Sequence, residues 1–429
     1  MSDRMWRRWL DRAGFVGATA GVFLLGFVQG ASLLTIRLDL AVAVLVVVLL
    51  EAVLSSVGFA AFVTVSTLAF LAQLRSDPSA VRTDGPSVIA VVPVYRDADV
   101  LERSVRSLLG SGYANLEIAV VCEPDDAASK RRAAELATHD RVTALVNTRY
   151  PGSKAGAINY AVEQTESAHV GVFDADELVH PEFVGAAVAD LADCDVVQGR
   201  TVPQPTGLVE ELAYYESVLL GYVSSRLLTL LTGFRMAVSR AVVVRREPLE
   251  CVGGYDEAML TEDFRFAFDC YTEGLDVREE LARPSRIEAA HSLSDWWGQR
   301  KRWMTGYAQV LHRLVGDLWP PAGYRDVTAA ALCGGIVAGS LFMLSLLAKF
   351  GVLVLVGAQA LVVAPVAAVV AVTGLVRVHD WRTGAVDGLG WAWLLVPLVF
   401  PLYSLTAIKA VVEYLSTWDG GWYRVEKEG

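Results

Sequence analysis

The stretch that decides the fold is VGVFDADE, residues 170–177, in which a short apolar run ends in two aspartates separated by one residue. Residues 170–173 are uncharged and partly β-branched, so they predict a buried strand. Asp174 and Asp176 follow the end of that strand, and in an open α/β sheet ligands bind beyond the carboxyl ends of the strands. Two hard oxygen ligands there suit Mg²⁺ or Mn²⁺, although a simple polar exit from a strand gives the same short pattern.

Apolar strands and amphipathic helices alternate around this stretch. The predicted strands are Ser87–Val94, Leu116–Cys122 and Val142–Asn147, and the predicted helices are Asp99–Gly110, Ala127–Thr138 and Lys154–Thr165. Strands that alternate with helices of this length predict a parallel, doubly wound α/β sheet. Because no Gly-x-Gly-x-x-Gly follows the first strand, a dinucleotide-dependent dehydrogenase is disfavoured.

The composition indicates a protein that is partly soluble and partly embedded in a membrane. Its 429 residues are 54% hydrophobic with a mean hydropathy of +0.41, yet 20% are charged. The net charge of −11 argues against a nucleic-acid partner, because phosphate backbones are bound by clustered Lys and Arg. The five cysteines are scattered without metal-like spacing, which is typical of reduced thiols in a cytosolic setting.

Two long apolar segments precede the α/β region. Residues 13–36 are uncharged and follow four arginines within residues 1–12, and residues 40–74 carry only Glu51, so each is long enough to cross a bilayer. A secretory signal begins in the same way, but the second apolar run so close behind favours a retained anchor. With Arg75 and Arg82 on the far flank, the α/β region is expected in the cytoplasm. Glu51 either faces a neighbouring helix or extends to the membrane interface.

Further apolar segments follow the α/β region at residues 327–347, 351–376 and 389–412, the first two separated by Lys349. The basic cluster of Arg377, His379 and Arg382 favours a cytoplasmic loop and three spans, and two spans plus an interfacial helix is the alternative. We therefore expect a multi-pass plasma-membrane protein surrounded by lipids. Its domains would be a membrane region with two transmembrane helices (1–83), a cytoplasmic domain ending in interfacial helices (84–320) and a membrane region with two or three transmembrane helices (321–429).

Three further motifs carry chemical groups within the soluble region. GSKAGAIN, residues 152–159, places Lys154 at a predicted helix start, where its charge and the helix dipole both favour an anion, although an exposed first-turn lysine gives the same pattern. TED, residues 261–263, follows GGYD and supplies two acids, which also suit a helix amino terminus capped by Thr261. QRKRW, residues 299–303, precedes the return to the membrane, and the alternative interpretation is a basic, aromatic helix lying on the membrane surface. The preceding His291 is expected to be structural or to gate a loop.

These motifs, in this order and between membrane segments, resemble membrane-embedded family 2 glycosyltransferases, the type that includes cellulose, chitin and hyaluronan synthases. The resemblance implies a GT-A-type nucleotide-sugar domain inserted between transmembrane helices. It implies that Asp174 and Asp176 hold a Mg²⁺ or Mn²⁺ ion on the donor diphosphate. Asp263 is then the general base that deprotonates the acceptor hydroxyl, and Glu262 orients it.

The resemblance also assigns donor and acceptor contacts. Tyr95, in PVYRD at residues 93–97, would lie against the nucleotide base, with Glu123 as the first and Asp126 as the second base-binding acid; Asp125 is equally a solvated loop residue. Lys154 and Asn159 match the donor-binding Lys-x-x-x-x-Asn pattern. Gln299 and Arg302 would hold the diphosphate, and Trp303 would stack on the acceptor sugar. Around residues 239–247 the family's Gly-rich stretch is absent and only the pair Arg245-Arg246 matches. The resemblance therefore does not specify the residues that line the acceptor side of the site, nor which sugar is transferred.

The function implied by the resemblance is an inverting transfer of a sugar from a nucleoside-diphosphate-sugar to the hydroxyl of a saccharide or lipid-linked acceptor. We expect a UDP-sugar rather than a GDP-sugar, and processive polysaccharide synthesis coupled to export. The alternatives are single addition to a polyprenyl or other lipid carrier, a non-catalytic polymer conduit, and a membrane-bound nucleotidyltransferase, which would have no use for Trp303.

Overall fold

The computed structural model describes residues 9–21, 38–76, 78–318 and 323–418. Of the predicted span over residues 13–36, the part beyond residue 21 lies outside the described residues. The chain divides into two units, which we describe separately. The sheet unit comprises Ser66–Gln299 and Thr373–Trp393, and the helical unit comprises the described parts of Met1–Val65, Arg300–Val372 and Leu394–Gly421. The predicted domain boundaries stay a prediction.

The sheet unit is built on a seven-stranded sheet with the order β3-β2-β1-β4-β6-β5-β7. The strands are β1 (Val88–Val94), β2 (Leu116–Cys122), β3 (Val142–Val146), β4 (His169–Val172), β5 (Val196–Pro203), β6 (Val242–Arg245) and β7 (Val277–Ile287). The α/β class is confirmed, but the prediction of a parallel sheet was wrong at β6, which runs antiparallel to β4 and β5. The reason is that the helical segment after β5 returns the chain to the edge at which β5 ended.

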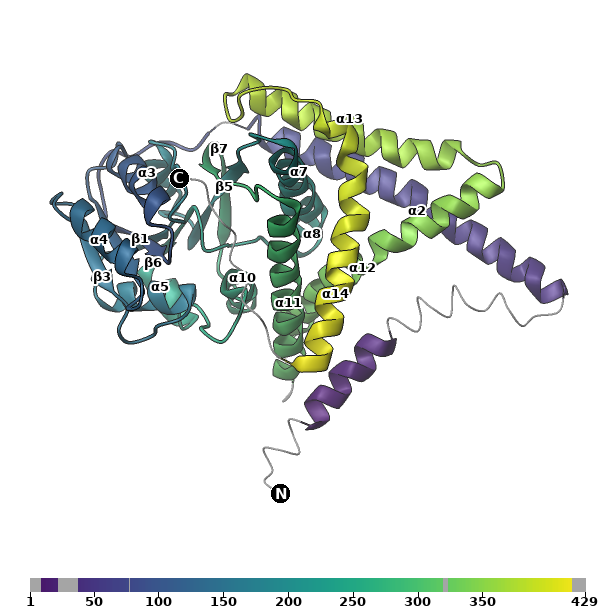
Figure 1. The fold of residues 1–429 in the computed structure, drawn as a ribbon, viewed down its shortest axis with the longest axis horizontal. Helices are drawn as coiled ribbons and strands as arrows, with labels where there is room; N and C mark the ends of the chain where they lie inside the picture. The colour runs from purple at the N-terminus through teal and green to yellow at the C-terminus, as the bar shows by residue number, and fades with distance from the viewer. Residues whose placement is uncertain (1–8, 22–37, 77, 319–322, 419–429) are drawn as a thin grey trace. The chain divides into compact units, whose positions relative to one another are not determined.

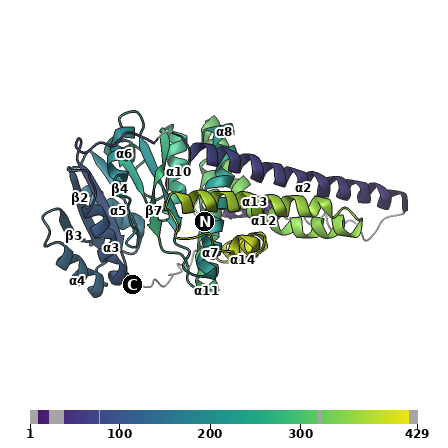
Figure 2. The same ribbon diagram turned by 90° about the horizontal axis from the view of Figure 1, so that it is seen from above.

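Helices cover both faces of the sheet. They are α3 (Ala98–Leu109), α4 (Ala127–Leu136), α5 (Lys154–Glu163), α6 (Phe183–Asp190), α7 (Leu208–Glu216), the π-helical η2 (Ser217–Val223), α8 (Ser224–Thr232), α9 (Arg246–Cys251) and α10 (Glu262–Glu273). Side chains of α3, α4 and α6 share one core with the strands. Because β-α-β crossovers are right-handed, α5, which leads back from β3 to β4, covers the opposite face (Figures 1 and 2).

This topology brings several loops to one edge of the sheet. The parallel strands β1, β2 and β4 all end there, so the segments that follow them emerge together. The antiparallel β6 begins at the same edge, which adds residues 239–241 to the group. The segment after β4 contains Asp174 and Asp176, as the sequence predicted.

The helical unit contains a helix over residues 9–21 and, wholly or in part, α2 (Leu38–Gln73), α11 (Leu293–Asp317), α12 (Tyr324–Leu355), α13 (Ala360–Arg382), the 3-10 helix η3 (Ala392–Leu398) and α14 (Val399–Thr417). Within the described residues, four segments are long and apolar enough to cross a membrane: Val44–Gln73, Tyr324–Leu355, Ala360–Arg382 and Ala392–Thr417. In Figure 1, α11 and α14 lie side by side, and Ala308 and Val411 share a core cluster.

Lys349 does not interrupt its apolar segment, contrary to the prediction, because α12 continues through it to Leu355. The Lys349 ammonium lies 2.8 Å from a carboxylate oxygen of Glu51 and donates to Ser55 at 3.1 Å. Glu51 therefore faces a neighbouring helix, the first of the two predicted possibilities. An ion pair of this kind lets two charges remain within otherwise apolar helices. All five cysteines are free thiols, as predicted.

Candidate active site

Lys154 joins three loops at the carboxyl edge of the sheet. Helix α5 begins here because the Ser153 hydroxyl accepts the Gly156 N–H at 3.0 Å, which places Lys154 in the first turn. The Lys154 ammonium lies 2.5 Å from Asp174 Oδ1 and 2.6 Å from the carbonyl oxygen of Ser239. Burial disfavours its charge, but the carboxylates of Asp174, Glu262 and Asp263 outweigh burial and raise the pKa of Lys154. The ammonium is therefore a fixed cation beside the strand-end aspartate.

Ser239 extends this linkage to the TED motif. Its hydroxyl donates to Glu262 Oε1 at 2.9 Å, and Glu262 is buried. Asp263 is partly buried, and its Oδ1 accepts the Phe264 N–H at 2.8 Å. The two acids open α10, as predicted, but the Thr261 side chain makes no capping hydrogen bond. Glu262 is thus held against the Lys154 loop, while Asp263 is the more accessible acid.

Glu177 is a site residue that sequence reasoning missed. It is fully buried, and its Oε2 accepts the backbone N–H groups of Asp174 and Ala241, each at 3.2 Å. Burial, and then the nearby charge of Asp174, raise the pKa of Glu177 to about 8. The carboxyl group therefore ties the loop after β4 to the start of β6. Its place in the DADE stretch was visible in the sequence, but its burial depends on β6 and was not.

The predicted base-binding acids serve as loop anchors in this structure. Glu123 is buried, and its two oxygens accept the Asn147 amide at 3.0 Å and the Gly152 N–H at 2.7 Å. Asp126 caps α4 by accepting the Ser129 N–H at 3.1 Å, and it also accepts the Arg96 N–H. Burial opposes ionisation of Asp126, but its hydrogen bonds prevail and lower its pKa. Base binding by either acid stays a prediction.

Tyr95 and Asn159 are likewise engaged within the protein. The Tyr95 hydroxyl donates to Asp125 at 3.3 Å. The Asn159 amide accepts the Tyr255 N–H at 3.0 Å and donates to the Tyr255 carbonyl at 2.8 Å, so it clamps the turn before the TED motif. Gly254 belongs to this turn with φ of +79°, and a Cβ there would lie 2.7 Å from Asn159 Oδ1. Donor binding by Tyr95 and Asn159 stays a prediction.

Gln299, Arg302 and Trp303 lie on α11 at a spacing that places them on one helix face. Gln299 belongs to the sheet unit, whereas Arg302 and Trp303 belong to the helical unit, so their position relative to the carboxylates stays a prediction. The preceding Trp296 is buried and donates its indole N–H to Glu216 at 2.6 Å, so it packs inside the protein.

His291 contacts Glu210, with 2.9 Å between its Nδ1 and Oε1, which agrees with a structural role.

The donor set of Asp174 and Asp176 fits a hard divalent cation. Asp176 is buried at the same loop as Asp174, and carboxylate oxygens are the ligands that Mg²⁺ and Mn²⁺ prefer. Among the described residues no group of three or more His, Cys, Asp or Glu side chains is arranged to hold a metal. That finding is compatible with Mg²⁺, which commonly uses one or two carboxylates together with substrate phosphates.

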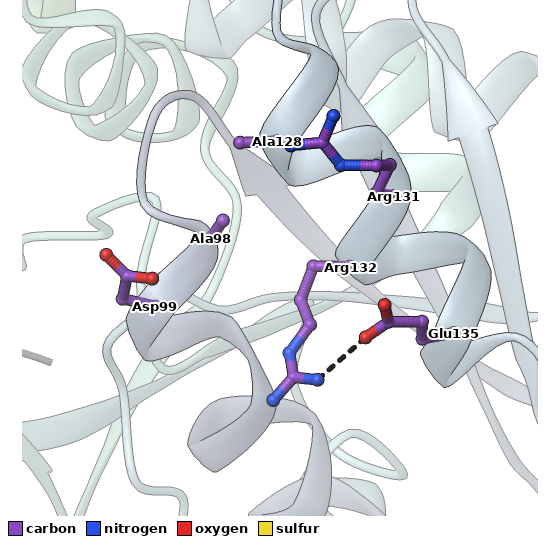
Figure 3. Close-up of a pocket in the computed structure, with 6 residues that line it drawn as sticks. All are labelled: Ala98, Asp99, Ala128, Arg131, Arg132 and Glu135. Atoms are coloured by element: carbon purple, nitrogen blue, oxygen red, sulfur yellow. Dashed lines mark hydrogen bonds and ion pairs between the residues drawn. The ribbon is translucent and has the colours of Figure 1, made fainter.

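A separate cavity of about 640 Å³ lies between the amino-terminal end of α3 and the length of α4 (Figure 3). Arg132 projects into it and pairs with Glu135 at 2.8 Å. Its lining residues are Ala98, Asp99, Ala128, Arg131, Arg132 and Glu135. None of the predicted site residues lines this cavity, so it is distinct from the carboxylate site.

Comparison with known proteins places this site in a family context. The model of the family described as "Glycosyltransferase like family 2" matches residues 86–306. A beta-monoglucosyldiacylglycerol synthase of Trichormus variabilis is 25% identical over 231 residues, covering 52% of this chain and 49% of the relative. A poly-beta-1,6-N-acetyl-D-glucosamine synthase of Staphylococcus epidermidis is 22% identical over 237 residues, covering 53% of this chain and 55% of the relative. The chain thus spans about half the length of these curated relatives.

Among solved structures, a mannosyltransferase of Pyrobaculum calidifontis "in complex with GDP-Man and Mn2+" covers 83% of this chain and 99% of its own, with a TM-score of 0.51 and 18% identity. At this identity the likeness concerns the fold, which is of the GT-A type.

Proposed function

Because this chain belongs to the glycosyltransferase-like family 2, we propose that it transfers a sugar, with inversion, from a nucleoside-diphosphate-sugar to an acceptor hydroxyl at the cytoplasmic face of a membrane. The observation that carries the proposal is the linkage through Lys154. This cation joins the strand-end Asp174 to the Ser239 loop, and that loop holds Glu262 beside Asp263. Lys154, which suits a diphosphate, is thereby connected to Glu262 of the acid pair, which suits an acceptor hydroxyl, through two hydrogen bonds made by Ser239.

In the proposed reaction, the acceptor oxygen attacks the anomeric carbon, the bond from that carbon to the diphosphate oxygen breaks, and the acceptor proton passes to Asp263. Asp263 suits this role because it is the less buried acid of the pair and needs to accept the proton only as the new bond forms. Glu262 positions the start of α10 through Ser239. Lys154 holds the diphosphate by its charge and by its place at the start of α5.

Asp174 and Asp176 would hold a Mg²⁺ or Mn²⁺ ion. Such an ion supplies Lewis-acid stabilisation of charge on the departing nucleoside diphosphate. The Mn²⁺ named for the P. calidifontis mannosyltransferase supports a divalent cation in this fold.

For the acceptor, we propose a growing polysaccharide, made processively and exported, with a UDP-sugar as the donor. The similarity to the S. epidermidis poly-N-acetylglucosamine synthase and the four apolar helices support this choice. The second candidate is single addition to a lipid acceptor, favoured by the similarity to the T. variabilis glucosyldiacylglycerol synthase. In both cases Gln299, Arg302 and Trp303 would contact the diphosphate and the acceptor, and the predicted domain scheme would keep the sheet unit in the cytoplasm.

The test uses the purified full chain in detergent with Mn²⁺ and a panel of UDP- and GDP-sugars. Nucleoside diphosphate release and product size are measured together. Asp263→Asn should lower release by about 100-fold or more, which is within the usual contribution of a general base. Glu273→Gln, an exposed acid on the same helix, is the matched control and should leave release unchanged.

A long product supports the polysaccharide synthase, and a product that stops at one sugar and requires added lipid supports the second candidate. Absence of release with every donor contradicts both.

A further inference from the structure

Arg240 lies between Ser239 and Ala241, just before β6, in the part of the chain that departs from the Gly-rich stretch of the resemblance. Its backbone is fixed on both sides. The carbonyl oxygen of Arg240 accepts the Gln198 amide at 2.9 Å, the neighbouring Ser239 carbonyl accepts Lys154, and the Ala241 N–H is bound by Glu177. Ala241 has φ of +43°, a conformation uncommon outside glycine. Arg240 is therefore held where the loops after β4 and before β6 meet.

Among the residues that the structure describes, none accepts a hydrogen bond from the Arg240 guanidinium. Within the described ranges it makes no hydrogen bond or ion pair, and its Nε is buried without a partner. Arg240 as a whole is half-buried. The fully buried Arg200 and Arg226 pair with Asp380 and Glu279, although the Nε of Arg200 also lacks a partner among the described residues. A guanidinium presents five N–H donors, and leaving a buried one unused is costly. The geometry indicates that an acceptor arrives with a ligand.

The surroundings keep Arg240 cationic. Burial disfavours its charge, but Asp174, Tyr222, Asp263 and Glu177 outweigh that effect and raise its pKa. Asp174 belongs to the proposed donor side of the site and Asp263 to the proposed acceptor side, so Arg240 lies within electrostatic reach of both. Lys154 is bound to Asp174 and to the Ser239 carbonyl. Arg240 adds a second cation to this part of the site, with donors that no described residue accepts.

We propose that Arg240 binds the diphosphate of the sugar donor, donating two N–H groups to oxygens of its terminal phosphate. A planar guanidinium matches phosphate oxygens in this bidentate manner, which an ammonium does not reproduce. Placed there, it also offsets the charge that develops on the leaving group when the glycosidic bond to the phosphate breaks. This inference rests on the proposed function, since it assumes that the ligand is a nucleoside diphosphate.

The inference is tested without catalysis by measuring the affinity for a series of nucleosides and nucleotides that differ only in the number of phosphates. The full chain in detergent, at a fixed Mn²⁺ concentration, is titrated calorimetrically with uridine, UMP and UDP, and with guanosine, GMP and GDP. Arg240→Gln removes the charge, Arg240→Lys keeps the charge without the planar fork, and Arg235→Gln is the control. Arg235 lies in the same connection, is partly exposed and is bound to Asp276 and the Val277 carbonyl, away from the site.

In Arg240→Gln we expect the diphosphate to bind about 10- to 100-fold more weakly, the range for a charge-assisted hydrogen bond, while nucleoside and monophosphate affinities change less than about twofold. Arg240→Lys should fall between wild type and Arg240→Gln, and Arg235→Gln should match wild type. If Arg240→Gln weakens the binding of nucleoside, monophosphate and diphosphate equally, the inference is overturned. It is also overturned if diphosphate binding is unchanged, even where the variant changes the KM for the acceptor. A wild-type chain that binds neither diphosphate overturns the proposed function, and the inference with it.

If Arg240→Gln does not fold, Arg240→Lys decides the question. A diphosphate affinity equal to wild type in that variant contradicts bidentate binding.

Discussion

Replacing Asp380 by Asn should strongly destabilise the sheet unit. Asp380, near the end of α13, accepts two hydrogen bonds from Arg200 of β5, at 2.8 and 2.6 Å, and one from the Tyr214 hydroxyl at 2.6 Å. The side chains of Arg200 and Asp380 are 2% and 0% exposed. In Asp380→Asn the guanidinium keeps its charge but loses its counter-ion in a place that water does not reach.

The expected cost follows from that burial. Removing one partner of a buried ion pair costs about 3–5 kcal/mol, because the remaining charge is left uncompensated. For a unit of this size, that loss lowers the midpoint of thermal unfolding by roughly 6–15 °C. In the double variant Arg200→Met/Asp380→Met no charge is stranded, although Tyr214 loses its acceptor. The double variant should therefore be more stable than Asp380→Asn.

The assay is thermal unfolding of the detergent-solubilised chain, followed by intrinsic fluorescence. Asp387→Asn is the control, because it removes an exposed acid from the connection that follows α13. A shift below about 2 °C for Asp380→Asn, or a double variant less stable than Asp380→Asn, would refute the view that the pair is desolvated and that the end of α13 is part of the sheet unit.

Three further predictions concern the Gly254 turn, the long apolar helices and the divalent cation. Gly254→Ala should destabilise the sheet unit by about 1–2 kcal/mol, measured by urea unfolding, because φ is +79° and the new Cβ would contact Asn159. Glu51→Gln should lower the unfolding midpoint because Lys349 loses its counter-ion, and Glu51→Gln/Lys349→Gln should recover part of that loss; equal midpoints for all three proteins would contradict the ion pair. Chelation with EDTA should abolish nucleoside diphosphate release and added Mn²⁺ should restore it; release that survives chelation would contradict a cation at Asp174 and Asp176.

The sequence was sufficient for the parts of the fold that depend on local pattern. The strand before Asp174, the helix that begins at Lys154 and the alternation around them follow from apolar periodicity and from Ser153 as a cap. The helices α7, η2 and α8 were not predicted. The antiparallel direction of β6 was missed because alternation alone does not specify direction.

Contacts between distant residues were also beyond the sequence. Arg200 and Asp380 are 180 positions apart, and nothing local identifies them as partners. Glu177 looked like one more acid after the strand, yet its burial makes it a neutral tie between loops near pH 7. Arg240 lies in the stretch that lacks the family's Gly-rich pattern and was not singled out, and only the position of β6 brings it within electrostatic reach of Asp174 and Asp263. In each case the sequence lacked the same information, namely which residues distant along the chain come into contact in the folded protein.

The one antiparallel strand is what assembles the site. Had β6 run parallel to β4, residues 239–241 would lie at the opposite edge of the sheet, away from Asp174. Because β6 is reversed, the residues just before it reach Lys154, Glu177 and Glu262: Ser239 bonds to Lys154 and Glu262, and Ala241 bonds to Glu177. The Lys154–Asp174 pair also gives the site a natural order of binding. Lys154 would share the Asp174 carboxylate with a divalent cation held there, and its ammonium would then be available to the diphosphate. Donor and metal should therefore bind cooperatively, and in Lys154→Gln the metal should bind more tightly without the donor while the added affinity it confers on the diphosphate should shrink.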